Sequence, residues 1–303
     1  MPFRITQESL SRTTLSNIKL NYKKMQEIQE KLSSGKQINR PSDDPSGARK
    51  VLGLRTEDLQ VQQFLDNTET AKEQINYTSN TLESIQEIFT KIKGLTIQAG
   101  NDTLGQSDRK IIANELDELL ESVLQNANTD NNGRYIFSGT ETLTSAFTAT
   151  RDSNGNISSV SYNGNNEEIK YQIGPDTFIQ VNLPGGKLFQ DNKSFSTLIS
   201  LRDALKASTF DSTAFSNLRN TLDTATNALS TEITKFGAKA NRLEMTTNSL
   251  ENSQTALKEL ISYTEDADVA SLIMDLKHQE NVLLSSLKTG AMVIQPTLLD
   301  FLR

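Results

Sequence analysis

The sequence predicts a mainly α-helical chain with a small β insert near its middle. Both ends carry apolar residues at helical spacing, proline is absent from residues 46–174 and 185–295, and the apolar spacing changes to two between Gly133 and Pro184. Since a proline inside a helix costs about 3 kcal/mol, the proline-free windows can hold long helices. We expect long antiparallel terminal helices that form a coiled coil or bundle, and an antiparallel β-domain that points outward.

The N-terminal helix is expected from Glu8 to Ser33. Its apolar residues lie three or four positions apart, as in the seam of a helix that packs on a partner helix. This seam consists of Leu15, Ile18, Tyr22, Met25 and Leu32. Gly35 is placed to end the helix. Residues 38–47 are dense in turn formers and predict an ordered loop.

The middle of the chain is expected to hold two helices and then the insert. The helices are expected over Ala48–Gly100 and Ser107–Thr129, with Ser107 or Asp108 as the cap of the second. Hairpin turns are expected at 152–156 and 163–166, which are rich in Asn and Gly. The expected strands are Ile157–Tyr162, Glu168–Ile173 and Thr177–Leu183. Residues 183–187 lack the spacing of a phosphate-binding loop, so we interpret them as a β-turn.

Helices are expected again after the insert. Their expected ranges are Ser194–Ala207, Asp211–Thr264 and Asp268–Ile294. In the long helix, Phe236, Leu243, Leu250 and Leu257 recur every seven residues, which is typical of a heptad seam. The last helix has a seam of Leu276, Leu283, Leu287, Ala291 and Ile294, and the apolar tail adds Leu298, Leu299, Phe301 and Leu302. Asp266 or Asp268 is expected to cap this helix.

These patterns divide the chain into consecutive segments. We expect a coiled-coil helix with its loop over residues 1–47, a helical rod over 48–132, the β insert over 133–193, a second rod over 194–264 and a C-terminal coiled-coil helix over 265–303. The seams at both ends contain many Asn, Gln, Thr and Ser residues. They could pack within one chain or between neighbouring copies.

Composition excludes several kinds of site and predicts no cofactor. The chain has no Cys and a single histidine, His278, so thiolate chemistry and multi-histidine metal sites are excluded. Its net charge of −7 argues against a dedicated nucleic-acid binder, which usually shows a basic face. The start lacks the apolar region of a signal peptide, and no stretch reaches the ~18 apolar residues of a membrane span. Taken alone, these features favour a cytoplasmic protein.

The candidate catalytic residues have simpler structural interpretations. Asp43 and Asp44 could form an acid–base pair or a Mg²⁺ site, but adjacent side chains rarely aim at one point, and their flanking prolines favour turn and cap roles. His278 has no nucleophile or orienting acid beyond Asp275 and is interpreted as solvated. The carboxylates of the insert show no spacing typical of an active site, so we predict no enzyme. They are Asp152, Glu167, Glu168 and Asp176.

Two motifs carry a family resemblance. Residues 32–48 resemble the N-terminal motif of bacterial flagellins and flagellin-like proteins, through a loop with Asn39, Pro41, Ser42, Asp43, Asp44 and Pro45. Residues 126–140 are similar to the flagellin-like hook-associated proteins, the third hook-associated proteins of the hook–filament junction. The motif residues are Asn132, Gly133, Arg134, Tyr135, Ile136, Phe137, Ser138 and Gly139. The resemblance covers residues 1–140 and 195–303.

This resemblance implies a secreted structural protein of the bacterial flagellum that acts in the junction between hook and filament. It implies export through the flagellar type III pathway without a signal peptide, which replaces the cytoplasmic expectation. The implied partners are further copies of the chain, flagellin, the hook-side hook-associated protein and an export chaperone at the C-terminal helix, with no nucleic acid or membrane. The seam and tail residues of both terminal segments are then expected to make subunit contacts in an inner tube.

Two other identities remain open at this point. A flagellin, the subunit of the filament, shares the terminal motifs, although the stretch 133–139 and the modest insert argue against it. A secreted coiled-coil effector or adhesin would explain the helices without a fixed place on the flagellum. Self-polymerisation distinguishes the flagellin from the junction protein.

Overall fold

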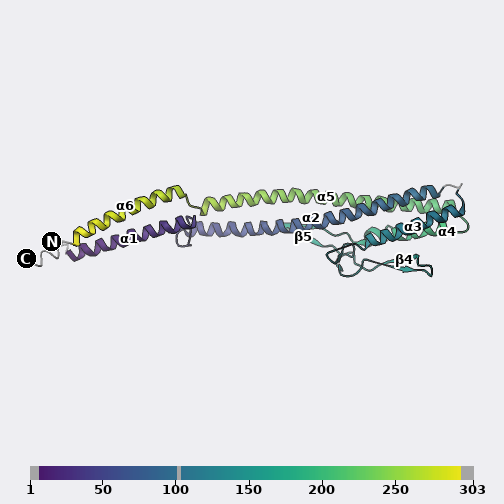
Figure 1. The fold of residues 1–303 in the computed structure, drawn as a ribbon, viewed down its shortest axis with the longest axis horizontal. Helices are drawn as coiled ribbons and strands as arrows, with labels where there is room; N and C mark the ends of the chain where they lie inside the picture. Colours follow the sequence, from purple (N-terminus) through teal and green to yellow (C-terminus); the bar gives the residue numbers. More distant parts are fainter. Residues whose placement is uncertain (1–6, 101–103, 295–303) are drawn as a thin grey trace, which may run out of the picture. The chain divides into compact units, whose positions relative to one another are not determined.

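The computed structural model describes residues 7–100 and 104–294. It confirms the predicted fold class, with long terminal helices and, in the middle of the sequence, small antiparallel strand pairs (Figure 1). The helices are α1 (Gln7–Ser34), α2 (Pro45–Ala99), α3 (Gln106–Ala127), α4 (Ser194–Lys206), α5 (Ser212–Glu265) and α6 (Val269–Ile294), with a short π-helix at Gly186–Gln190. The chain forms two compact units: the first holds residues 1–60 and 253–303, and the second holds 61–252.

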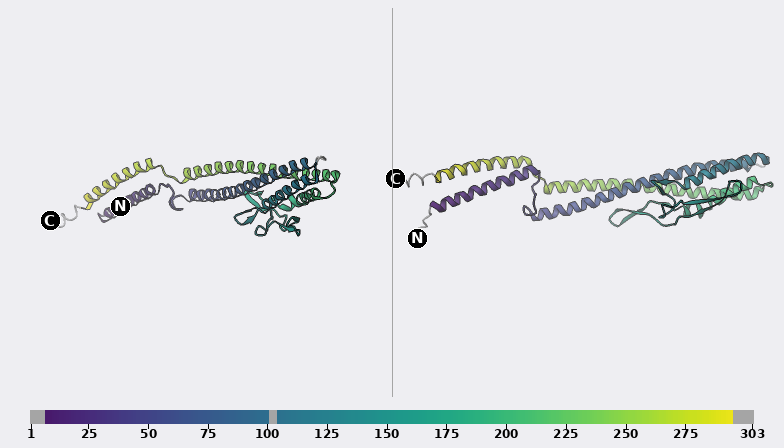
Figure 2. Two further views of the ribbon diagram at one scale, coloured as in Figure 1. Left: turned by 45° about the vertical axis from the view of Figure 1, so that its right-hand side comes forward. Right: turned by 60° about the horizontal axis from the view of Figure 1, so that its bottom comes forward.

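In the first unit, α1 and α6 run antiparallel side by side (Figure 2). Gly290 of α6 permits a close approach, because a Cβ at this position would lie 3.1 Å from Cδ1 of Ile18 on α1. Asp268 caps α6, since its carboxylate accepts hydrogen bonds from the backbone amides of Ala270 and Ser271 at 3.0 and 3.2 Å. The predicted pairing of the terminal helices and one of the two predicted caps are therefore confirmed.

The helical core of the second unit consists of stripes that the sequence pattern predicts. On α5, Leu222, Ala225, Leu229, Phe236 and Leu243 are buried. They pack with buried residues of α2 and α3, which include Ile75, Leu82, Ile85, Phe89, Ile92, Leu116 and Leu120. Since apolar burial contributes about 25 cal/mol per Å², these stripes stabilise the packing of the three helices.

The strands of the second unit form separate antiparallel pairs on one side of its helices (Figure 2). They are β1 (Asp130–Asn131) with β2 (Arg134–Tyr135), β3 (Phe147–Arg151) with β4 (Ile157–Tyr162), and β5 (Lys170–Gly174) with β6 (Thr177–Gln180). The hairpin turn predicted at 152–156 is confirmed. There the carboxylate of Asp152 accepts hydrogen bonds from the amides of Asn154 and Asn156 at 2.8 and 2.9 Å.

The turn predicted at 163–166 is wrong as a hairpin, because β4 and β5 do not pair. Instead, this segment binds a distant loop: the Asn165 amide accepts a hydrogen bond from the Thr140 backbone at 2.9 Å. The β-turn expected at 183–187 is also wrong. The chain enters the π-helix there, which buries Leu188 and Phe189, and the side chain of Asn192 donates to the carbonyl of Leu188 at 2.8 Å.

The helix starts differ from two expectations. The cap of α3 is Gly105, with no side-chain hydrogen bond, so the prediction of Ser107 or Asp108 is wrong. Helix α2 begins at Pro45, earlier than predicted. A proline suits the first turn of a helix, where its missing N–H would have no helical partner.

No helix within residues 7–100 and 104–294 combines the length and apolar character needed to cross a lipid bilayer.

Candidate functional site

The candidate packing surface is the apolar face of the α1/α6 pair. Among its predicted residues, Leu15 and Tyr22 on α1 are each 51% exposed, and Leu287 on α6 is 48% exposed. Ala291 is exposed as well, whereas Ile18, Met25, Leu32, Leu276 and Leu283 are half-buried. We call these nine residues the α1/α6 apolar surface. The side chain of Ile294 and the residues Leu298, Leu299, Phe301 and Leu302 lie outside the described residues.

The helix seam predicted from the sequence also includes Ile273 of α6, which is 47% exposed. Sequence reasoning missed further exposed apolar residues on α1 and α6. They are Leu10, Leu20, Met274, Leu284 and Met292. They lie outside the assigned seam positions. Large apolar residues outside the seam of a predicted helix were the signal in the sequence that could have identified them. Helix pairs in a finished core do not expose this many large apolar side chains, and such exposure marks an interaction surface.

The interface between α1 and α6 is partly polar. The side chain of Asn21 donates to the hydroxyl of Ser286 at 2.8 Å, and the amide of Gln279 donates to the backbone carbonyl of Asn21 at 3.1 Å. Gln279 is only 9% exposed. Polar groups in a helical seam fix its register at a cost in stability. Hydrogen bonds therefore help to align the pair, alongside apolar contacts such as that of the buried Leu272.

The loop after α1 uses its carboxylates for local structure. The Asp43 carboxylate accepts the backbone amides of Arg40 at 2.8 Å and Asn39 at 3.1 Å. The bond from Arg40 makes the largest contribution to holding the pKa of Asp43 below its ordinary value. The Asp44 carboxylate accepts the amide of Ser46 at 3.0 Å, at the start of α2. The interpretation of both carboxylates as turn and cap groups is confirmed.

A buried carboxylate joins this loop to the α5–α6 connection, and sequence reasoning missed it. Glu265 is 7% exposed, and its carboxylate lies 2.8 Å from the Lys36 ammonium and 2.6 Å from the Arg55 guanidinium. Burial alone would raise the pKa of Glu265, but hydrogen bonds from Lys36 and Arg55 outweigh it and lower that pKa. The backbone amide of Gln37 also donates to the Glu265 carbonyl at 2.7 Å.

The family motif of residues 132–139 has a structural role. Asn132 and Gly133 both have positive φ and form the turn between β1 and β2. Ile136 and Phe137 are buried, and the ring of Phe137 meets that of Phe189 edge-on at a centroid distance of 5.8 Å. The motif therefore folds the start of the insert onto its aromatic core.

Gly139 completes this motif at a close backbone approach. It has a φ of +72°, and a Cβ there would overlap the backbone oxygen of Asn165. The hydroxyl of Tyr162 donates to the carbonyls of Phe137 and Asn165, at 3.0 and 2.7 Å. These contacts hold residues 163–166 against the motif. They explain why this segment packs on residues 137–140 and does not form a hairpin turn between β4 and β5.

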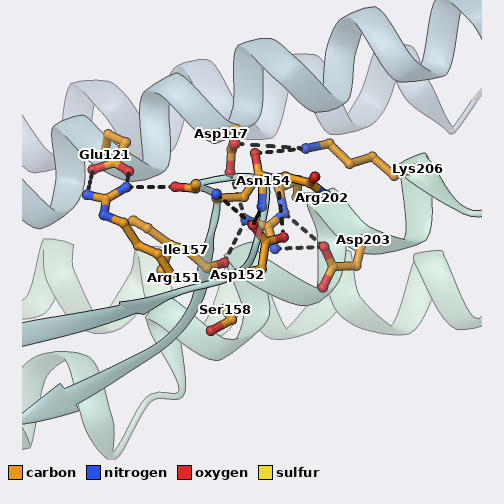
Figure 3. Close-up of polar contacts among 12 residues, drawn as sticks. Asp117, Glu121, Arg151, Asp152, Asn154, Ile157, Ser158, Arg202, Asp203 and Lys206 are labelled. Atoms are coloured by element: carbon orange, nitrogen blue, oxygen red, sulfur yellow. Dashed lines mark hydrogen bonds and ion pairs between the residues drawn. The ribbon is translucent and has the colours of Figure 1, made fainter.

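An ion-pair cluster fixes the β3–β4 hairpin between α3 and α4 (Figure 3). Arg202 of α4 is 3% exposed and donates to the Asp117 carboxylate, the Asp203 carboxylate and the Ile157 carbonyl, at 2.7, 2.8 and 2.7 Å. Burial would lower the pKa of Arg202, but its bonds to the two carboxylates raise it. On the strand side, Arg151 pairs with Glu121.

The remaining candidate catalytic residues have ordinary surroundings. His278 is exposed on α6. In the insert, Asp152 belongs to the hairpin turn, and Glu168 pairs with Lys170 at 3.0 Å. Among the residues that the structure describes, no group of three or more His, Cys, Asp or Glu side chains is placed to hold a metal ion.

The comparisons with known proteins agree with the motifs. Residues 5–142 match the model of the bacterial flagellin N-terminal helical region, and residues 220–295 match that of the flagellin C-terminal helical region. The flagellar hook-associated protein 3 of Escherichia coli is 28% identical over 229 residues, which cover 74% of this chain and 67% of that protein. Flagellin of Bacillus subtilis is 26% identical over 283 residues, 88% of each chain.

Solved structures show the same fold. A flagellar hook-associated protein of Vibrio parahaemolyticus superposes with a TM-score of 0.66 at 19% identity, over 74% of this chain and 99% of that one. The flagellar hook-associated protein 3 of Legionella pneumophila gives a TM-score of 0.62 at 16% identity, over 69% of this chain and 97% of that one.

Proposed function

The chain belongs to the bacterial flagellin family, and on that premise we propose that it is a structural subunit of the junction between flagellar hook and filament. The observation that carries the proposal is the half-exposed α1/α6 apolar surface. Support for the junction, as opposed to another place in the flagellum, comes from the similarity to hook-associated protein 3 of Escherichia coli and from the motif of residues 132–139.

The energetic reasoning concerns what assembly would bury. Complete burial of a large apolar side chain is worth about 1.5–3 kcal/mol, so covering the exposed half of Leu15, Tyr22 or Leu287 adds about 1 kcal/mol each. Polar groups such as Asn21 in the seam fix its register and lower the stability of the helix pair. In a helical array every copy repeats these contacts. The assembly therefore gains a stabilising free energy that a single chain does not have.

The family resemblance supplies the rest of the assembly. The α1/α6 pair, with the tail that follows it, would form an inner tube with neighbouring copies, and the loop 39–45 would lie at a subunit contact. One end of the layer would meet the hook-side hook-associated protein and the other would meet flagellin. The chain would leave the cell through the flagellar type III pathway after an export chaperone engages its C-terminal helix. Its role would be structural, without catalysis or a cofactor.

A second candidate is the filament subunit itself. It is favoured by the match to Bacillus subtilis flagellin, which extends over 88% of both chains and so exceeds the match to the hook-associated protein in coverage. The two candidates share the α1/α6 apolar surface. They differ in whether the chain extends a filament by itself.

A seeding experiment followed by electron microscopy separates the candidates. Purified chain is added to isolated hooks and then flagellin is added, while a parallel sample receives the chain and filament seeds alone. A short terminal layer that permits filament growth is the expected result. Long filaments made of the chain alone would identify a flagellin, and binding to neither seed would contradict both candidates.

Matched variants connect this assay to the proposed surface. Replacing both Leu15 and Leu287 by Ser is expected to abolish the terminal layer, because it removes apolar area that assembly would bury. Leu143→Ser is the control, since Leu143 is 83% exposed on the second unit. Circular dichroism checks that helix content is unchanged. A double variant that still forms a normal layer would contradict the proposed surface.

A further inference from the structure

The second unit contains a cavity of about 470 Å³ between α5 and the segment from β6 through the π-helix. One wall carries Lys235 and Lys239 of α5, and the other carries Lys187 and Asn182. The volume lies within the roughly 300–1,000 Å³ that small-molecule sites occupy. The cavity is far in sequence from the α1/α6 apolar surface and has no part in the proposed assembly.

The charges around this cavity are mainly positive. Lys187 lies 3.8 Å and Lys170 3.0 Å from the carboxylate of Glu168, and Lys235 lies 2.7 Å from that of Glu232. Lys239 is a further cation, and no carboxylate among the described residues forms an ion pair with it. The cations therefore exceed the carboxylates locally, although the chain has a net charge of −7.

Lys239 is the cation with the least compensation. Within the described residues its ammonium makes no ion pair, and it lies 4.7 Å from the ring centroid of Phe236. The residue is half-buried, and burial lowers the pKa of its amine. The carboxylates of Glu232 and Glu168 offset part of this effect, but neither forms an ion pair with the ammonium. An anion in direct contact with Lys239 would offset the remaining cost of burial.

The amide groups that line the cavity are already engaged. The Asn182 side chain accepts from the amide of Ile169 and donates to the carbonyl of Glu167, at 2.9 Å in each case. The side chain of Asn192 donates to the carbonyl of Leu188 at 2.8 Å. A guest would therefore rely on the lysine ammonium groups. Lys187 and Lys235 would be shared with the carboxylates of Glu168 and Glu232, whereas Lys239 forms no ion pair among the described residues.

We propose that this cavity binds a small anion that carries carboxylate or phosphate groups, held by Lys235 and Lys239 from α5 and by Lys187 from the opposite wall. Lysine binds both kinds of group as a compact point charge. Lysines on both walls, which outnumber the one carboxylate that lines the cavity, Glu232, favour a guest with more than one anionic group. Citrate and pyrophosphate represent the two chemical classes.

Calorimetric titration of the full-length chain with citrate, and separately with pyrophosphate, tests the site at constant ionic strength. We expect saturable binding of at least one probe, with one site per chain. Lys239→Met and Lys187→Met should each weaken it about tenfold, which is the loss of one charge-assisted hydrogen bond. Methionine retains the apolar stem beside Phe236, and circular dichroism monitors the fold.

Lys258→Met is the matched control, because Lys258 lies on the same helix outside the cavity and its ammonium donates to Gln254 at 3.1 Å. Its affinity should equal that of the unaltered chain. Absence of saturable binding by both probes would overturn the proposal. Equal affinities for the Lys239→Met variant and the unaltered chain would overturn it as well, because general attraction to lysines would then explain the signal.

Discussion

Alanine substitutions at two glycines of the family motif separate backbone strain from packing. Gly133 and Gly139 have nearly equal φ values, +74° and +72°. At Gly133 a Cβ would have no neighbour within 4 Å, whereas at Gly139 it would overlap the backbone oxygen of Asn165. Both substitutions therefore place an alanine in the left-handed backbone conformation, but only Gly139→Ala also creates a steric overlap.

The expected magnitudes follow from this difference. An L-residue in the left-handed region costs roughly 1–2 kcal/mol, so Gly133→Ala should lose about that much stability. Gly139→Ala should lose about 1–3 kcal/mol more, because overpacking a filled site adds a cost of that size. The neighbouring oxygen belongs to the backbone and is held by the hydroxyl of Tyr162, so it cannot simply rotate away.

Urea denaturation followed by circular dichroism measures both variants. The midpoint should fall further for Gly139→Ala than for Gly133→Ala, with the slope of the transition unchanged. Equal losses would show that residues 163–166 do not press on the motif. The structural role assigned to the motif would then be wrong.

Three other predictions concern polar contacts. Asp268→Ala should destabilise α6 by about 1 kcal/mol, because two amides lose their cap; unchanged hydrogen exchange in the first turn of α6 would contradict this. Asp117→Ala should cost about 2–3 kcal/mol, less than the 3–5 typical of a broken buried pair because Asp203 still pairs with Arg202; an unchanged urea midpoint would contradict a stabilising role for this ion-pair cluster. The lowered pKa of Glu265 means that its contribution to stability is present above the ordinary value of 4.5 and is lost as pH falls through its folded pKa. Carbon-13 NMR of the carboxylate should therefore show a midpoint below 4.5 that rises in Lys36→Met, and a midpoint at or above 4.5 in the unaltered chain would contradict it.

The helices could be predicted because their information is local. Periodicity alone placed the seam of α5 through Phe236 and Leu243, and the structure buries both. Proline and glycine marked the ends, with Gly35 in the left-handed conformation after α1. The hairpin turn at 152–156 was equally local, because Asp152 bonds to amides within four residues. Strand β3 (Phe147–Arg151), directly before this turn, was not predicted, although the predicted turn and the predicted strand Ile157–Tyr162 imply a partner strand there.

The remaining features depend on contacts between residues far apart in the sequence. Residues 163–166 have the composition of a hairpin turn, but Asn165 binds Thr140 instead. Arg202 looks like a surface residue of an amphipathic helix, and only folding brings it to Asp117 on α3. Glu265 likewise meets Lys36 across most of the chain. No spacing rule along the sequence could have paired these charges.

Cysteine labelling tests most directly whether the α1/α6 apolar surface becomes buried in the flagellum. The chain contains no native cysteine, so Leu15→Cys introduces a single reactive group on the surface and Leu143→Cys introduces one away from it. Both should react with a maleimide in the free chain. After assembly on hooks and filament growth, we predict that Leu15→Cys is protected and that Leu143→Cys still reacts. Equal reactivity of Leu15→Cys before and after assembly would contradict the proposed packing.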